Sequence, residues 1–229
     1  MVRRRSLFAI LARGVGWAGI ALLVLFLGLV ALYAVVAPVS TLMLGRMIEG
    51  KSYERNAVRL RDISPAAVAA VIVSEDASFC SNDGVDWGAL QSVLSKTRGA
   101  GPSRGASTIT MQTAKNLFLW PGHSFVRKGL EIGMALVLGK AWPKARTIEI
   151  YLNIAEWGDG AFGIEAAARR YFHKSASELN DHEAALLAAA LPNPFLRNPA
   201  RPTAFHRRLA AHVEAKARGA SNLLDCLPR

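Results

Sequence analysis

Residues 105–116 read GASTITMQTAKN. Small and hydroxyl-bearing residues come first, an amide follows and then Lys115, an order that suits a loop turning into a helix with Ser107 as its N-cap. Backbone N–H groups at such a helix start, together with the Lys115 ammonium group, attract an anion such as phosphate. The stretch therefore predicts a helix that begins beside an anion-binding site.

Helical segments separated by turn residues follow one another through the rest of the chain. Asn180 with Glu183 reads as a capping box, and Thr203 reads as the cap of a last helix. No run of alternating β-branched residues predicts a sheet, so we expect a mainly α fold with at most a short hairpin. The helices are expected at 65–75, 86–96, 108–119, 124–140, 142–153, 164–172, 180–191 and 203–218.

Residues 14–37 contain no charged side chain. A helix of this length spans about 36 Å at about 1.5 Å per residue, enough to cross a bilayer core of about 30 Å. A cleaved signal peptide is the alternative, but its apolar core runs about 7–15 residues and ends in a small-x-small site, which residues 33–37 match poorly. We therefore expect an uncleaved transmembrane helix.

The arginines of residues 1–13 set the expected orientation. By the positive-inside rule, this tail lies in the cytoplasm. Residues 38–62 then form a basic juxtamembrane connector, and residues 63–229 form a single domain outside the cytoplasm. The chain is expected to cross the membrane once.

The formal net charge is +11 over 229 residues. Such an excess suits a membrane surface, a phosphate-bearing substrate or nucleic acid. Nucleic acid requires a cytoplasmic domain, against the arginine asymmetry, and basic residues are not interleaved with aromatics as in single-strand binders. Nucleic acid is therefore excluded as the expected partner.

Two cysteines, Cys80 and Cys226, lie 146 positions apart. An extracytoplasmic location permits a disulfide, but two distant cysteines form no framework, and we expect them to be unpaired. The five histidines are scattered, and neither CxxC nor HExxH spacing occurs, so no zinc site is expected.

Three clusters of polar residues could carry chemistry. Glu75 ends its helix beside a partly apolar wall, which raises the pKa of a carboxyl group and suits a general base. Residues 105–116 form the second cluster. Arg127, Lys128 and Glu131 form the third, with cation and anion on one helix face. Each cluster also has a plainer interpretation as solvated acids, a capped helix and a surface ion pair.

In this order the clusters resemble the motifs of the family 51 glycosyltransferases, the peptidoglycan glycosyltransferases. The resemblance covers residues 63–199, and the monofunctional transglycosylases of Gram-negative bacteria are most similar. It rests on EDASF at 75–79, GVD at 84–86, GASTITMQTAKN at 105–116, RKGLE at 127–131, EIYLN at 149–153 and AEWGDGAFGIEAA at 155–167.

The resemblance implies a lysozyme-like helical domain, residues 63–229, that lies on the periplasmic side of the bacterial inner membrane and polymerises lipid II into glycan strands. A sugar 4-hydroxyl of incoming lipid II attacks C1 of the growing lipid-linked chain, and undecaprenyl pyrophosphate leaves with inversion. No cofactor is required, and Mg²⁺ or Mn²⁺ is compatible with Glu131. Penicillin-binding proteins and divisome components are compatible partners.

By resemblance, Glu75 is the general base and Glu131 the second catalytic carboxylate. Lys115, Arg127 and Lys128 lie where cations offset pyrophosphate charge. The hydrogen-bonding residues of the groove are Ser107, Thr108, Gln112 and Asn116. We expect structural roles for Tyr151 and Asn153, and Asp86 reads as a helix cap.

Three positions depart from the family pattern. Asn82 replaces a usual His, Met111 a usual Gln, and His123 a common Arg. Neither Ser-x-x-Lys nor Lys-Thr-Gly occurs, so no transpeptidase chemistry is expected. A lysozyme-type hydrolase also uses paired carboxylates, but it has no pyrophosphate to hold. A non-enzymatic scaffold for cell-wall synthases is the other alternative, and the presence of both Glu75 and Glu131 argues against it.

Overall fold

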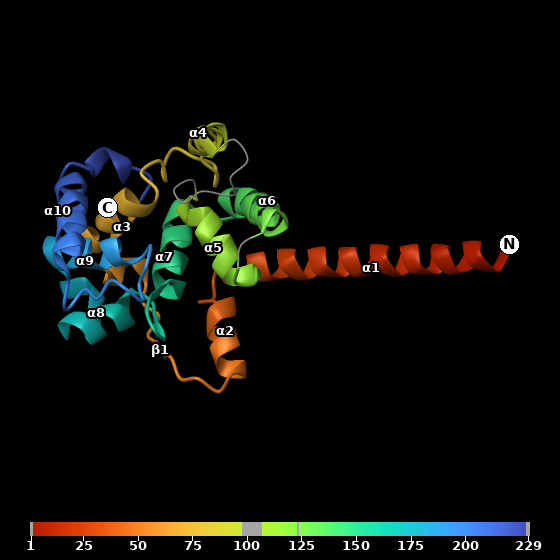
Figure 1. Cartoon of the computed structure of the whole chain (residues 1–229), viewed down its shortest axis with the longest axis horizontal. Helices are drawn as coiled ribbons and strands as arrows, with labels where there is room; N and C mark the ends of the chain where they lie inside the picture. Colours follow the sequence, from red (N-terminus) through yellow and green to blue (C-terminus); the bar gives the residue numbers. More distant parts are fainter. Residues whose placement is uncertain (1, 98–106, 123, 228–229) are drawn as a thin grey trace. The chain divides into compact units, whose positions relative to one another are not determined.

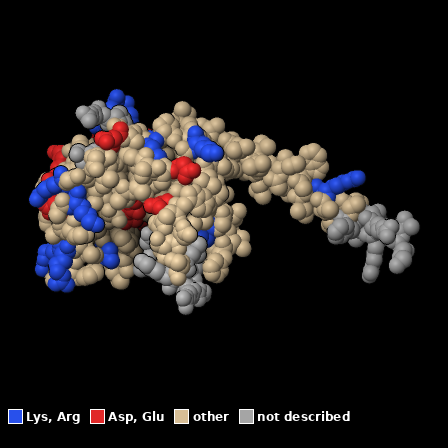
Figure 2. Space-filling model, turned by 90° about the horizontal axis from the view of Figure 1, so that it is seen from above, with Lys and Arg blue, Asp and Glu red and all other residues tan. Residues whose placement is uncertain are grey.

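The computed structural model describes residues 2–97, 107–122 and 124–227. The chain divides into two units after Val36. The first unit is the helix α1 (Val2–Tyr33), of which Ala9–Tyr33 is apolar and long enough to cross a membrane. Figure 2 shows almost no charge along its described length. α1 ends before Ala37 because Pro38 disfavours helical backbone at the residue that precedes it.

The second unit contains nine α-helices within the described ranges (Figure 1). They are α2 (Thr41–Ile48), α3 (Pro65–Glu75), α4 (Trp87–Thr97), α5 (Ile109–Phe118), α6 (Phe125–Ala141), α7 (Lys144–Ile154), α8 (Ile164–Phe172), α9 (Asp181–Ala190) and α10 (Ala204–Arg218). The 3₁₀ turns are η1 (Leu60–Asp62), η2 (Ala176–Glu178) and η3 (Ser221–Leu223). The expected helical fold is confirmed.

Residues 38–62, expected as a connector, carry ordered elements of this unit. Ser40 caps α2, because its Oγ accepts the Met43 N–H at 3.2 Å. The Thr41 hydroxyl donates to the Leu119 carbonyl at the end of α5, 2.8 Å away. The second unit therefore begins before Ile63, where the sequence analysis placed its start.

A small sheet joins this segment to the middle of the chain. β1 (Glu54–Arg55) pairs in parallel with β3 (Ala161–Phe162), and β2 (Glu156–Gly158) pairs antiparallel with β3. The β2–β3 pair is the short hairpin that the sequence allowed. The third strand, β1, comes from a segment more than 100 residues earlier in the chain, so no local sequence pattern predicted its pairing with β3.

Two helices with apolar or small residues on every side form the core. Residues 67–73 of α3 and 184–190 of α9 are all buried. A helix without a polar face is stable only inside a protein. α3 packs on α9, and α10 covers both, while α5 packs against α6 and α7 (Figure 1). Glu75 therefore ends a rigid, interior helix.

Most of the expected helix caps are confirmed. Asp86 Oδ1 accepts the Ala89 N–H at 2.8 Å, and Ser124 caps α6. Asn180 and Glu183 form the capping box of α9, and Thr203 caps α10. These caps are local, which is why the sequence predicts them well.

Ser64 behaves differently from the expected cap. α3 does begin with Pro65 at its first position, but no helix N–H donates to the Ser64 side chain. Its hydroxyl instead donates to the Leu179 carbonyl, 2.7 Å away. Tertiary contact has diverted this side chain from the helix to the segment before α9.

The expectation that the cysteines are unpaired is wrong. Cys80 and Cys226 form a disulfide, with Cα atoms 5.4 Å apart. α10 runs against α3 and α9 and returns the chain end to the loop that follows α3. Two cysteines that are 146 residues apart in the sequence are therefore adjacent in the folded protein.

Removal of this disulfide should destabilise the protein. We expect the double variant Cys80→Ala/Cys226→Ala to lose about 2–5 kcal/mol of unfolding free energy, because the cross-link restricts the unfolded chain. Thermal unfolding of the detergent-solubilised protein, followed by tryptophan fluorescence, measures the change. Wild-type protein treated with reductant is the matched control and should unfold at the variant's temperature. Equal midpoints for oxidised wild type and variant would contradict the prediction.

Candidate active site

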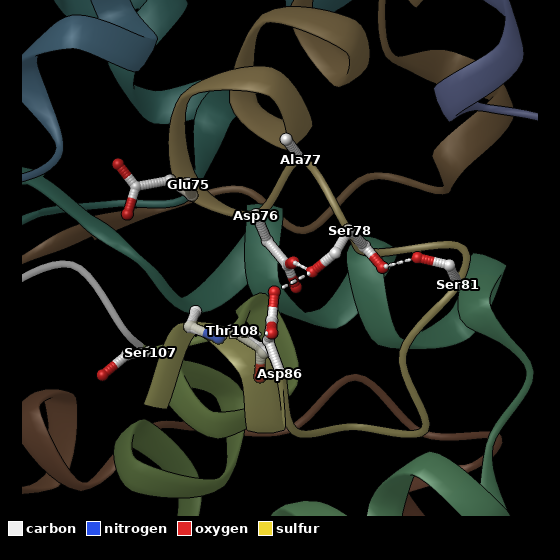
Figure 3. Close-up of a pocket in the computed structure, with 9 residues that line it drawn as sticks. Glu75, Asp76, Ala77, Ser78, Ser81, Asp86, Ser107 and Thr108 are labelled. Carbon is white, nitrogen blue, oxygen red and sulfur yellow. Dashed lines mark hydrogen bonds between the residues drawn. The ribbon is translucent and has the colours of Figure 1, made fainter. Parts of the chain in front are cut away.

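A hollow of about 400 Å³ lies at the C-terminal end of α3 (Figure 3). Three segments meet there: the end of α3 with its following loop, the start of α4 and the start of α5. The lining residues are Glu75, Asp76, Ala77, Ser78, Ser81, Asp86, Ala89, Ser107 and Thr108. Three of the residues predicted from the sequence, Glu75, Ser107 and Thr108, are thus brought together.

Glu75 presents its two carboxylate oxygens differently. Oε2 accepts a hydrogen bond from Gln112 Nε2 at 2.9 Å. Oε1 is buried and has no hydrogen-bond partner among the described residues. Burial raises the pKa of this carboxyl group, against the Gln112 hydrogen bond and the charges of Lys115 and Arg197. A carboxylate in such a setting holds a proton more readily than one in water, as a general base requires.

The neighbouring carboxylate of Asp76 points to another side of the chain (Figure 3). Asp76 Oδ2 accepts the N–H of Ile109, the first residue of α5, at 3.0 Å. Asp76 Oδ1 lies 3.0 Å from the Ser78 hydroxyl and 3.1 Å from Asn82 Nδ2. Burial raises the Asp76 pKa, and these hydrogen bonds oppose the rise. Asp76 therefore joins the start of α5 to the end of α3.

Asn82, which departs from the family pattern, belongs to this network. Its amide nitrogen donates to Asp76, and its Oδ1 accepts the Gly84 N–H at 3.0 Å and lies 3.2 Å from Lys144 Nζ. An amide can donate and accept at once without carrying charge. The neutral Asn82 side chain thus donates a hydrogen bond to Asp76 and accepts one from the Gly84 N–H.

Gly84 allows α6 to lie against this loop. Its φ is +113°, and a Cβ there would lie 2.4 Å from the Ala135 carbonyl oxygen. Gly139, one helical turn further along α6, likewise approaches the Asp83 carbonyl too closely for a side chain. Only glycine fits this backbone contact, which fixes α6 beside the hollow.

Thr108, not Ser107, caps α5. The Met111 N–H donates to Thr108 Oγ1 at 3.1 Å, and the Thr108 hydroxyl donates to the Gly84 carbonyl at 2.6 Å. Ser107 Oγ instead accepts from Lys128 Nζ at 2.8 Å. The Ser107 cap expected from local pattern is wrong, because the loop at Gly84 and the α6 side chain Lys128 position the two hydroxyls.

Lys128 and Glu131 form an ion pair in which the carboxylate is buried and the lysine is partly buried. Lys128 Nζ lies 2.8 Å from Glu131 Oε1, and Glu131 is only 3% exposed. A solvated surface pair, the plainer interpretation of this cluster, is therefore wrong. Through Ser107, the pair is linked to the hollow that Glu75 lines.

The remaining predicted cations line a second hollow, of about 200 Å³. Lys115, Asn116 and Arg127 lie there, with residues of the α2 start and of the segment after α5. Arg127 is buried, and its Nε has no partner among the described residues. Burial lowers the Lys115 pKa, while the charges of Glu131 and Glu75 oppose this. Of the three predicted cations, Lys115 and Arg127 therefore line this second hollow, whereas Lys128 lines neither of the two hollows among the described residues and hydrogen-bonds to Ser107 of the first.

Tyr151 contributes a contact that the sequence analysis missed. Its hydroxyl lies 3.1 Å from Gln112 Oε1, so it reaches Glu75 through one side chain. Asn153, by contrast, has the structural role expected, since its side chain bonds both backbone groups of Val58. The YLN motif marks both residues, but only the fold distinguishes them.

Two further departures have different outcomes. Met111 is fully buried and lines neither hollow, so an apolar side chain suits its position on α5. His123 lies outside the described residues. As for metals, no group of three His, Cys, Asp or Glu side chains suited to an ion occurs among the residues that the structure describes.

A family model described as Transglycosylase matches residues 42–217. Proteins named biosynthetic peptidoglycan transglycosylase are similar over nearly the whole chain. That of Agrobacterium fabrum is 47% identical over 222 residues, covering 96% of this chain and 98% of the relative. That of Brucella suis is 50% identical, covering 91% and 93%. That of Rhizobium meliloti is 45% identical, covering 98% and 92%.

Proposed function

This chain belongs to the transglycosylase family and is a peptidoglycan glycosyltransferase, and we propose that it elongates glycan strands from lipid II. The observation that carries the proposal is Oε1 of Glu75, which has no hydrogen-bond partner in the described part of the chain and lies beside a hollow lined by further polar groups. A buried acceptor without a donor is costly unless a ligand supplies one. The attacking sugar hydroxyl would be that donor.

Glu75 acts as the general base in this proposal. The 4-hydroxyl of incoming lipid II forms a bond to C1 of the growing chain, and its proton passes to the Glu75 carboxylate. The bond from C1 to the pyrophosphate oxygen breaks, and undecaprenyl pyrophosphate leaves. Attack from the face opposite the leaving group inverts C1.

The predicted cations, of which Arg127 is buried and the two lysines are partly buried, stabilise the departing group. Lys128, held by Glu131, and Lys115 with Arg127 offset the charge that builds on the pyrophosphate. Ser107 and Asn116, which line the two hollows, hydrogen-bond to the substrate, whereas Thr108 and Gln112 are held by groups of the protein and shape the site. The reaction needs no resident cofactor. The residues present do not fit Mg²⁺ or Mn²⁺, because the Glu131 carboxylate is buried and already paired with the Lys128 ammonium group.

We place the domain on the periplasmic side of the inner membrane, with α1 as a single anchor and the N-terminus in the cytoplasm. The Cys80–Cys226 disulfide supports this side, because disulfides persist in oxidising compartments. On the face shown in Figure 2, basic side chains lie in groups among acidic and uncharged ones and form no continuous basic stripe of the kind that binds nucleic acid. The chain polymerises without cross-linking peptides, so penicillin-binding proteins or divisome components are its proposed partners.

Purified full-length protein in detergent should convert labelled lipid II into long glycan strands, resolved by gel electrophoresis. Isolated peptidoglycan, offered in parallel, should remain uncleaved. Cleavage of peptidoglycan with lipid II untouched would indicate a hydrolase. Inactivity on both substrates, with a normally folded protein, would indicate a scaffold. Either result would overturn the proposed polymerase.

A further inference from the structure

Glu75, Gln112 and Tyr151 form a chain of hydrogen bonds across three helices. Tyr151 lies on α7, Gln112 on α5 and Glu75 at the end of α3. The Tyr151 oxygen is 3.1 Å from Gln112 Oε1, and Gln112 Nε2 is 2.9 Å from Glu75 Oε2. We propose that Tyr151 is a positioning residue, which orients the Gln112 amide so that its N–H faces the carboxylate of Glu75.

The donor and acceptor chemistry fixes this direction. A carboxylate only accepts hydrogen bonds, whereas an amide has one accepting end and one donating end. If the Gln112 amide were reversed, its oxygen would face the Glu75 carboxylate and repel it. The reversal would also leave the Tyr151 O–H without an acceptor, since Gln112 Oε1 is its hydrogen-bond partner within the described part of the chain.

Burial keeps the tyrosine in its donating form. Tyr151 is 1% exposed, and burial with the nearby charge of Glu75 raises its pKa well above the usual value of a phenol. The hydroxyl therefore remains protonated at neutral and moderately alkaline pH. It is a fixed donor rather than a proton carrier.

The chain of hydrogen bonds from Tyr151 through Gln112 to Glu75, called the relay below, gives the two carboxylate oxygens of Glu75 different roles. Oε2 is held by Gln112, and Oε1 has no partner among the described side chains and backbone groups. A hydrogen bond to the ionised form favours ionisation, opposing the effect of burial. Tyr151 therefore influences the pKa of Glu75 indirectly, through the orientation of the Gln112 amide.

Tyr151→Phe tests the proposal, which rests on Glu75 being the base in the proposed function. The carboxylate loses a well-oriented donor, so its pKa rises. The acidic limb of the pH profile of kcat/KM should move upward by about half a unit to one unit. Tyr171→Phe is the matched control: its hydroxyl bonds the Trp157 carbonyl, away from Glu75, and the limb should not move.

A double-variant cycle separates positioning from mere packing. Gln112→Met should shift the limb in the same direction, and adding Tyr151→Phe should shift it no further. Two additive shifts, or an unmoved limb in Tyr151→Phe alone, would overturn the relay.

A second readout does not need turnover. The side-chain carboxyl of ¹³C-labelled glutamate reports ionisation by NMR, and Glu75→Gln assigns the Glu75 signal. In the full-length protein in detergent, its titration midpoint should rise in Tyr151→Phe and stay unchanged in Tyr171→Phe. An unchanged midpoint in Tyr151→Phe overturns the relay even if lipid II is polymerised. A raised midpoint supports the relay even if lipid II is not the substrate.

Discussion

Glu75→Gln should lower the rate of glycan polymerisation by about 10²–10⁴-fold, the usual contribution of a general base. The amide keeps the shape of the side chain but cannot accept the proton of the attacking hydroxyl. The change is measured with labelled lipid II under single-turnover conditions, so that product release does not hide it. Glu49→Gln is the control, because Glu49 is an exposed carboxylate on the C-cap of α2 and should leave the rate unchanged.

The same variant should be at least as stable as the wild type. Burial raises the folded-state pKa of Glu75, so ionisation opposes folding as the pH rises above the unfolded value of about 4.3. Glutamine removes this opposition. At pH 7 to 8 the variant should therefore unfold at an equal or higher temperature, and near pH 4 the difference should vanish. Strong destabilisation would mean that lost activity reflects lost structure.

Lys128→Met should be the most destabilising single change at the site. It leaves the Glu131 carboxylate buried without its cation, and breaking a buried pair in this way costs about 3–5 kcal/mol. Polymerisation should fall as well, because Lys128 also holds Ser107 at the hollow. Thermal unfolding and the lipid II assay measure the two effects. Lys140→Met, an exposed lysine on the same helix, is the control.

Adding Glu131→Gln to Lys128→Met separates the two effects. The second change removes the orphaned charge, so much of the lost stability should return. Activity should not return, because the double variant still lacks the Lys128 charge that is proposed to offset the charge of the donor pyrophosphate. An unfolding temperature for Lys128→Met equal to that of the wild type would show that the Glu131 carboxylate is not buried in solution.

The helices could be predicted from the sequence because their signals are local. Pro65, Asp86, Ser124 and Thr203 each begin a helix through groups within a few residues along the chain. The same local logic misassigned Ser107 and Ser64. Their hydroxyls bond to Lys128 and to the Leu179 carbonyl, which come from distant segments. A local rule fails where a tertiary partner competes for the same side chain.

By itself, the sequence determined a mainly helical fold with an apolar N-terminal helix, and the order of its motifs indicated the enzyme family. Periodicity, caps and motif order are properties of the chain. Only the tertiary structure decided which groups meet: the Cys80–Cys226 bond, the burial of Glu131 and the path from Tyr151 to Glu75. The disulfide depends on how α10 packs against α3 and α9, and the other contacts depend on how α3, α5, α6 and α7 pack. Packing brings together residues that are far apart in the sequence, so no local pattern predicts their contact.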